Sequence, residues 1–218
     1  MNKTVLLFAA VVAGSVLAGE PAAPAEGTAI LNAASPWRSH LLNRTPVVDP
    51  AAQKAAGMDM AKPAVLPVKT AYGGPGWLTG YNSPPLPAEW VGNEFDDSDW
   101  MRGGLPRDFS TTTGLLAVRG SFVVSDPGTV RKLLLNLEYR GGVVVYLNGK
   151  EVARADMPEG PVTCSTPARL YGDEAYLDAA GKTLTDAGHA KGDDAARIGK
   201  RNRTAGPIEI PVASLRKG

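Results

Sequence analysis

The sequence predicts an all-β fold built from antiparallel strands, and two observations carry that prediction. Residues 133–139 place four apolar side chains on one face of an extended chain, Leu133, Leu135, Leu137 and Tyr139. A period of two is typical of a strand with one buried face. In addition, Asn148-Gly149 separates two strand-like runs, 143–147 and 150–154. This pair tolerates positive φ at both positions and predicts a two-residue type I′ hairpin, with Tyr146 opposite Glu151 and Val145 opposite Val152.

Residues 1–18 are predicted to be a signal peptide. Lys3 gives a positive start, the chain is then mostly apolar to Leu17, and small residues precede Gly19. That order is typical of an export signal, so we expect an exported protein, periplasmic or extracellular. A short N-terminal membrane anchor is the alternative. No later stretch approaches 18 apolar residues, so no membrane span is expected in the mature protein.

The remaining elements follow in chain order. Residues 19–35 are rich in Ala, Pro and Glu and predict a flexible lead-in, and 36–42 predict a first strand. Residues 116–124 again alternate, with Arg119 on the face opposite Val118. Residues 155–206 are polar and weakly patterned, which predicts a long irregular connection with short helices near 173–180 and 193–198. A last short strand is expected over 208–212.

Composition excludes several function classes. The chain has 218 residues, enough for a sizeable core, and a formal net charge of +1, so no overall basic field favours nucleic acid. A single cysteine, Cys164, excludes an intramolecular disulfide or a multi-cysteine zinc site. We expect it to be buried, with pairing between chains as the alternative. With only His40 and His189 besides, the composition argues against a metallohydrolase.

Several motifs in register carry a resemblance to a known family. They are Trp90, Phe95-Asp96-Asp97-Ser98-Asp99-Trp100, Val118-Arg119-Gly120-Ser121-Phe122, the strand 133–139 and Val145-Tyr146-Leu147-Asn148-Gly149-Lys150-Glu151-Val152. In that order they resemble the galactose-binding-domain-like β-sandwich, the jelly roll at the N-terminus of family 2 glycoside hydrolases. The resemblance covers about residues 77–218.

The resemblance implies an antiparallel β-sandwich of the jelly-roll type over residues 36–218, with a long irregular connection and short helices. Leu215-Arg216-Lys217-Gly218 matches the start of the family's closing turn, so we expect the domain to be truncated before its last strand. The sequence departs from the family pattern at two places, so the family's ligand contacts are not carried over to this chain. Ala117-Val118 precede Arg119 where the family has an aromatic residue, and Arg140-Gly141-Gly142 stand where many members have acidic residues.

No residues are expected to be catalytic, and the chain is not predicted to be an enzyme. Glu138 and Glu151 are interpreted as the polar faces of strands, and no G-x-S-x-G elbow is present. The acidic residues of 95–100 lack the spacing of a calcium loop and predict a turn with Phe95 and Trp100 as core anchors. No cofactor is expected, although the resemblance leaves a structural calcium open.

Four aromatic residues outside the expected core strands are candidates for sugar stacking: Trp77, Tyr81, Tyr171 and Tyr176. Pyranose C–H faces pack well on large amphipathic rings. Arg140 could donate hydrogen bonds to a sugar hydroxyl or carboxylate, and a surface strand end explains it equally. Packing in the core is the alternative for each aromatic residue. The basic run 197–203 is interpreted as a solvated loop, with contact to acidic polysaccharide as the alternative.

Together these observations predict a non-catalytic, secreted carbohydrate-binding or accessory module. The expected partner is a glycan or a neighbouring domain of a longer chain, and not nucleic acid. Two alternatives stay open. One is the N-terminal structural domain of a larger glycoside hydrolase or other secreted hydrolase. The other is a cell-surface protein–protein interaction module.

Overall fold

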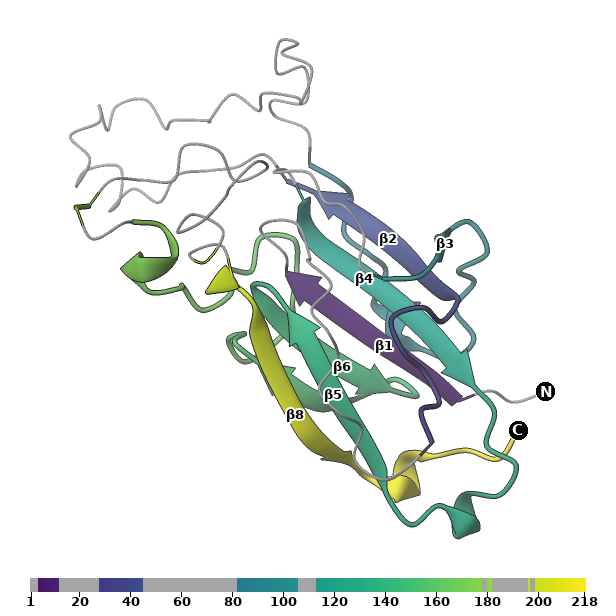
Figure 1. Ribbon diagram of the computed structural model, residues 1–218. Helices are drawn as coiled ribbons and strands as arrows, with labels where there is room; N and C mark the ends of the chain where they lie inside the picture. Colours follow the sequence, from purple (N-terminus) through teal and green to yellow (C-terminus); the bar gives the residue numbers. More distant parts are fainter. Residues whose placement is uncertain are drawn as a thin grey trace.

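The fold is β-rich, and every strand pairing among the described residues is antiparallel (Figure 1). The computed structural model describes residues 4–11, for their backbone alone, together with 28–44, 82–105, 113–177, 180–181, 196 and 199–218. Its strands are β1 (Thr4–Val11), β2 (Trp37–Asn43), β3 (Met101–Gly103), β4 (Thr113–Phe122), β5 (Leu133–Tyr139), β6 (Gly142–Leu147), β7 (Lys150–Ala155) and β8 (Arg203–Ile210). Short 3₁₀ helices connect them: η1 (Ala88–Val91), η2 (Pro127–Thr129), η3 (Asp173–Ala175) and η4 (Val212–Ser214).

The strands form one larger and one smaller sheet. The larger sheet has the order β3-β2-β4-β1-β6-β7, and β5 pairs with β8 in the smaller one. Strand β1 therefore lies between β4 and β6, with Thr4 opposite Phe122 and Leu6 opposite Leu147. This strand belongs to the segment predicted as a signal peptide. Processing of that segment stays a prediction.

Both sheets contribute to the main hydrophobic core. Figure 1 shows β5 and β8 lying across the face of the larger sheet, over β6. The buried cluster includes residues of β4, β6, β5 and β8, among them Val118, Val145, Leu147, Leu135, Tyr139 and Ile210. Burial of each such side chain contributes about 1.5–3 kcal/mol, so this contact is the main force that holds the smaller sheet in place.

The Asn148-Gly149 hairpin is confirmed, with one difference in register. Asn148 has φ 52° and Gly149 φ 82°, and Tyr146 pairs with Glu151. The predicted pairing of Val145 with Val152 is wrong, because Val145 lies opposite Ala153. The register shifts by one residue at this point, as in a β-bulge, which leaves an extra residue on β7.

Two other expectations need correction. Strand β8 begins at Arg203, five residues before the expected start, because pairing with β5 extends the strand through polar residues. Gly206 makes this passage possible. Its φ is 127°, and a Cβ there would lie 2.6 Å from the Leu135 carbonyl oxygen. The second correction concerns Cys164, which is half-buried rather than buried and forms no disulfide.

The region near residue 175 contains the short helix η3, within the range where one was expected. The other expected helix, 193–198, lies largely outside the described residues, and so does His189.

The segment before β3 is fastened to β4 by one buried arginine. The Arg119 side chain is 4% exposed and donates from Nε to Asp97 Oδ2 at 2.7 Å. Its two terminal nitrogens donate to the carbonyl oxygens of Trp90 and, at 3.1 Å, Gly92. The guanidinium also lies 5.3 Å from the centroid of the Phe95 ring. Each of its three nitrogens therefore has an acceptor, as a buried cation requires.

The predicted turn over 95–100 is confirmed. The Ser98 amide donates to Asp96 Oδ1 at 3.0 Å, so this carboxylate satisfies backbone within the turn. Trp100 is buried, and Phe95 packs edge to face against it with ring centroids 5.7 Å apart. Both aromatic residues belong to a second core cluster beside Leu115 and Ala117.

We predict that Arg119→Ala destabilises the protein far more than Arg38→Ala. Both arginines pair with Asp97, but Arg38 is 23% exposed and its ion pair is longer, at 3.1 Å. Removing the buried partner should cost about 3–5 kcal/mol of unfolding free energy, because it leaves the desolvated carbonyl groups of Trp90 and Gly92 without this donor and removes one of the two cations paired with Asp97. The Arg38 pair is more exposed than that of Arg119, and its loss should cost about 0–1 kcal/mol. Urea unfolding of both variants measures the difference, and equal losses would contradict the assigned role.

Candidate ligand site

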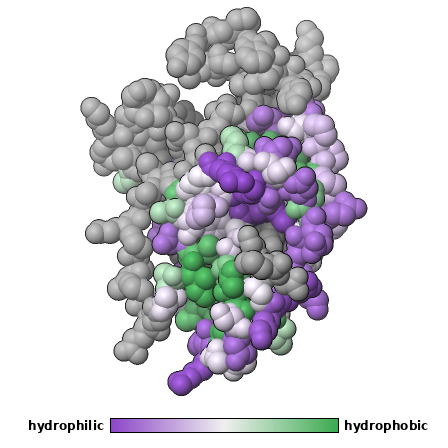
Figure 2. All heavy atoms as spheres, turned by 90° about the vertical axis from the view of Figure 1, so that its right-hand side faces the viewer, coloured by the Kyte–Doolittle hydropathy of each residue, from purple (hydrophilic) through white to green (hydrophobic). Residues whose placement is uncertain are grey.

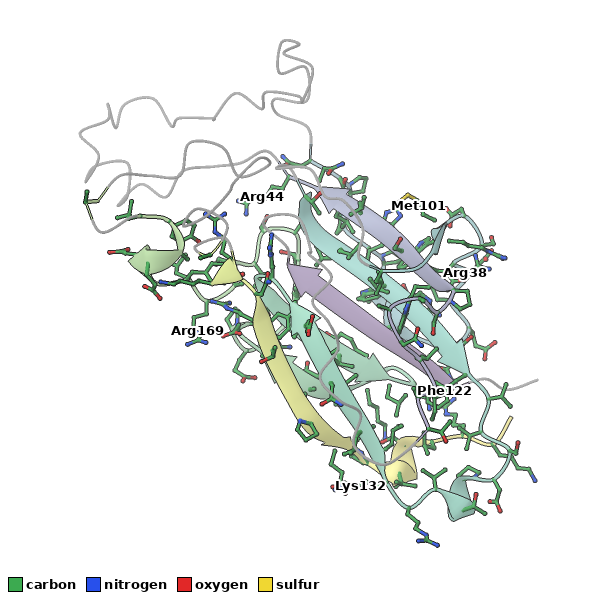
Figure 3. The ribbon with its side chains drawn as sticks, viewed as in Figure 1. Arg38, Arg44, Met101, Phe122, Lys132 and Arg169 are labelled. Carbon is green, nitrogen blue, oxygen red and sulfur yellow. The ribbon has the colours of Figure 1, made fainter. Side chains whose placement is uncertain are left out.

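Three of the five predicted site residues come together at one end of the smaller sheet. Arg140 directly follows β5, and Tyr171 and Tyr176 flank η3, next to the place where Tyr139 pairs with Arg203. Figure 3 shows Arg169 near this end of β8 and Lys132 at the opposite end. The other two predicted residues, Trp77 and Tyr81, lie outside the described residues.

Arg140, Tyr171, Tyr176, Arg201 and Arg203 form the cluster described below. In it, an arginine guanidinium lies over the ring of each tyrosine. The guanidinium of Arg203 lies 4.0 Å from the centroid of Tyr171, and that of Arg201 lies 4.8 Å from the centroid of Tyr176. The two tyrosine rings meet edge to face, with centroids 6.2 Å apart. A guanidinium over an aromatic face is attracted by the ring quadrupole, which contributes about 0.5–2 kcal/mol. Tyr176 nevertheless remains 40% exposed.

The same arginines fix the backbone around η3. Arg203 donates to the carbonyl oxygens of Gly141 at 2.5 Å and of Arg169 at 2.8 Å, while Arg201 donates to that of Ala175 at 2.9 Å. The interpretation of 197–203 as a solvated loop is therefore wrong for Arg201 and Arg203. Both side chains are partly buried, because their planar groups lie between a tyrosine ring and main-chain carbonyls.

Asp156 is the anionic centre beneath the cluster. It follows β7 with φ 56° and accepts from the Tyr139 hydroxyl at 2.7 Å and from Arg169 Nε at 2.6 Å. Burial raises the pKa of Asp156, but the hydrogen bonds from Tyr139 and Arg169 and the charge of Arg203 outweigh burial, so its pKa is lowered overall. Burial, followed by the hydrogen bond to this carboxylate, raises the pKa of Tyr139 to about 12.

Arg140 differs from its neighbours because its donors are not all used. It is 4% exposed, which corrects its interpretation as a surface strand end. Its Nε donates to Asn202 Oδ1 at 2.8 Å, but its Nη2 is buried and has no acceptor among the described residues. Burial is the largest cause and lowers the pKa of Arg140; Tyr171 opposes it, and the charge of Arg201 adds a smaller lowering effect. A buried donor without an acceptor costs about 1–3 kcal/mol.

The cluster therefore suits a ligand rich in oxygen acceptors. It combines a buried, incompletely paired guanidinium with a partly exposed aromatic ring. Asp156 is already engaged by three side chains, so it is poorly placed to act as a base. In the described part of the chain, His, Cys, Asp and Glu form no group of three that could hold a metal ion.

Sequence reasoning missed Asp156, Asn202 and the stacking role of Arg201 and Arg203. The basic run did mark this segment, but its pattern holds no information on which aromatic rings the arginines meet about 25 to 35 residues away.

A search of the described residues finds no helix long and apolar enough to cross a membrane.

We predict that folding stability falls as pH rises from about 10 to 12. The folded-state pKa of Tyr139, about 12, exceeds the ordinary value of 10, so its stabilising contribution is complete below pH 10 and is lost as pH rises through 12. Tyr139→Phe should flatten this decline. Urea unfolding at a series of alkaline pH values measures it for both proteins, and an unchanged slope in the variant would contradict the assignment.

The chain matches no family model, no curated protein and no solved structure. Its resemblance to the galactose-binding-like β-sandwich stays a prediction from the motifs.

Proposed function

We propose that this chain is an exported, non-catalytic carbohydrate-binding module, that its two sheets form a β-sandwich of the galactose-binding-like jelly-roll type, and that Arg140, Tyr171 and Tyr176 belong to its ligand site. The observation that carries the proposal is the buried Nη2 of Arg140, which has no acceptor among the described residues. Carbohydrate binding and export also draw on the resemblance and on the predicted signal peptide.

Saccharides have groups that match both the guanidinium and the aromatic ring of this cluster. Their hydroxyl groups, and the carboxylates of uronic acids, supply acceptors for a guanidinium. The partly exposed ring of Tyr176 offers a surface for the C–H face of a pyranose. Arg201 lies against this ring, so cationic and aromatic groups would contact the same sugar. This combination favours an acidic saccharide over a neutral one.

The site is built in advance of binding. Main-chain carbonyls at Arg169, Leu170 and Ala175 are all held by arginines of the 201–203 segment. Binding of a ligand would therefore cost little conformational entropy, because the loop is already ordered. This low cost favours measurable affinity even where the contact area is small.

Docking to a neighbouring domain is the second candidate function. Figure 2 shows a compact group of hydrophobic side chains in the lower half of one face, while hydrophilic side chains cover much of the remaining coloured surface. Grouped exposed apolar surface marks sites of protein contact. With this function, the chain would be a structural domain of a larger hydrolase or a protein–protein interaction module.

We predict that the full chain binds acidic polysaccharide, and that Arg140→Gln and Tyr176→Ala each weaken binding by about 10-fold or more. Loss of one charged hydrogen bond or one stacking contact costs about 1–3 kcal/mol, and 1.4 kcal/mol is tenfold. A glycan array followed by pull-down on uronic-acid and neutral polysaccharides measures binding, and circular dichroism confirms folding of each variant.

Two matched variants control this experiment. Lys132→Ala removes a positive charge at the opposite end of the smaller sheet, where it pairs with Glu209, and Leu170→Ala changes an exposed residue of the same loop. Both should bind like the parent. A folded parent that binds no glycan would favour the docking function. Equal losses in all four variants would place the ligand site elsewhere.

A further inference from the structure

The guanidinium of Arg140 is paired with a neutral amide. Arg140 directly follows β5 and Asn202 directly precedes β8, so the two residues continue the ladder in which Tyr139 lies opposite Arg203. The Nε of Arg140 donates to Asn202 Oδ1 at 2.8 Å, while its Nη2 is buried and has no acceptor among the described residues. None of the ion pairs in the described part of the chain includes Arg140. Its charge therefore has no anionic partner there.

The two nitrogens Nε and Nη2 belong to the same edge of the planar guanidinium group. A carboxylate can bind such an edge with both of its oxygens, in the bidentate arrangement that arginine favours. An asparagine side chain has the same shape as an aspartate but only one oxygen, so it can accept from one of the two nitrogens alone. Asn202 thus occupies a position on Arg140 that a carboxylate would fill completely.

Asn202 is also the member of this pair that solvent reaches. Its side chain belongs to an exposed residue, whereas Arg140 is only 4% exposed. Exposed side chains change rotamer within picoseconds to nanoseconds, so the amide of Asn202 can leave the guanidinium without any change in the fold. Its departure would give a ligand access to both Nε and Nη2, although Nη2 is buried while Asn202 is in place.

We propose that Asn202 occupies a carboxylate subsite on Arg140, and that the carboxylate of a uronic acid displaces it when an acidic saccharide binds. The exchange replaces one hydrogen bond to a neutral acceptor with two charge-assisted hydrogen bonds, so it favours an anion over a neutral sugar hydroxyl. Asn202 is then a specificity-determining residue of the proposed ligand site. The identity of the ligand rests on the proposed function, whereas the incomplete pairing of Arg140 can be tested without any ligand.

Asn202→Asp in the full chain supplies the missing oxygen from within the protein. Its carboxylate accepts from both Nε and Nη2 of Arg140, and the exposed position costs it little desolvation. The midpoint of thermal unfolding should therefore rise by about 2–4 °C, and this rise should be absent in the Arg140→Gln background. Binding of polygalacturonate, measured by pull-down, should fall by about 10-fold or more, because the subsite is already filled.

Asn202→Ala removes the side chain and leaves the subsite open. Its unfolding midpoint should fall below that of the parent, while polygalacturonate binding should stay equal or become tighter, since no amide has to be displaced. Methyl-esterified polygalacturonate has lost the anionic charge and should bind both proteins about 10-fold or more weakly. Asn136→Asp is the matched control, because it adds the same charge at an exposed position of β5 and should keep the parental midpoint and binding.

A purely structural asparagine predicts a different result, in which stability and binding change in the same direction. An unchanged or lower midpoint for Asn202→Asp would overturn the proposal, whatever the parent binds. Parental binding by Asn202→Asp, or loss of binding in Asn202→Ala as complete as in Arg140→Gln, would also overturn it. A folded parent that binds neither polymer would overturn the proposed function and the ligand assigned to this subsite. In that case the midpoint of Asn202→Asp still shows whether the pairing of Arg140 was assigned correctly.

Discussion

Much of the larger sheet depends on the hydrogen bonds that the Arg119 side chain donates. It lies in β4, which pairs with both β2 and β1, and its guanidinium reaches out of the strand to hold Trp90, Gly92 and Asp97. The segment before β3 has little regular structure of its own, so its polar backbone groups need partners from elsewhere. One side chain with five donors supplies them, and the aromatic cluster around Trp100 closes over the same place.

In the candidate ligand site, arginine side chains again hold an irregular segment by donating hydrogen bonds to its main-chain carbonyl oxygens. Arg201 and Arg203 hold the backbone around η3 through its carbonyl oxygens, and their planar faces rest on Tyr176 and Tyr171. Arg140 differs from these clamps and from Arg119 because one of its buried nitrogens has no acceptor among the described residues. Among the described residues, each nitrogen of the other buried arginine, Arg119, has an acceptor, so the unpaired nitrogen of Arg140 is the reason for proposing a ligand there.

The strands could be predicted from sequence where a local pattern decides them. Alternation over 133–139 and the Asn148-Gly149 pair act within a few residues, and β5 and the hairpin formed as expected. The early start of β8 could not be predicted, because its polar residues become a strand only through pairing with β5. The bulge opposite Val145 likewise depends on the rest of the sheet.

The same distinction applies to the site. Tyr171, Tyr176 and Arg140 were identifiable by residue type, since aromatic rings and guanidinium groups are what sugar recognition needs. Their proximity was not identifiable, because it arises from the meeting of β5, η3 and β8 across more than 60 residues. For Arg140 the burial follows from that meeting as well, with Asn202 on β8's approach as its partner.

The anchoring of the η3 segment by its main chain has a consequence for how this surface can change. Carbonyl oxygens are common to every amino acid, so these hydrogen bonds do not depend on the exposed side chains of the loop, apart from the two tyrosine rings on which the arginines stack. Leu170, Asp173 and Glu174 are exposed there and could be exchanged while the loop keeps its path. Substitutions at these positions could thus change the chemistry of this surface without disturbing the backbone that presents it.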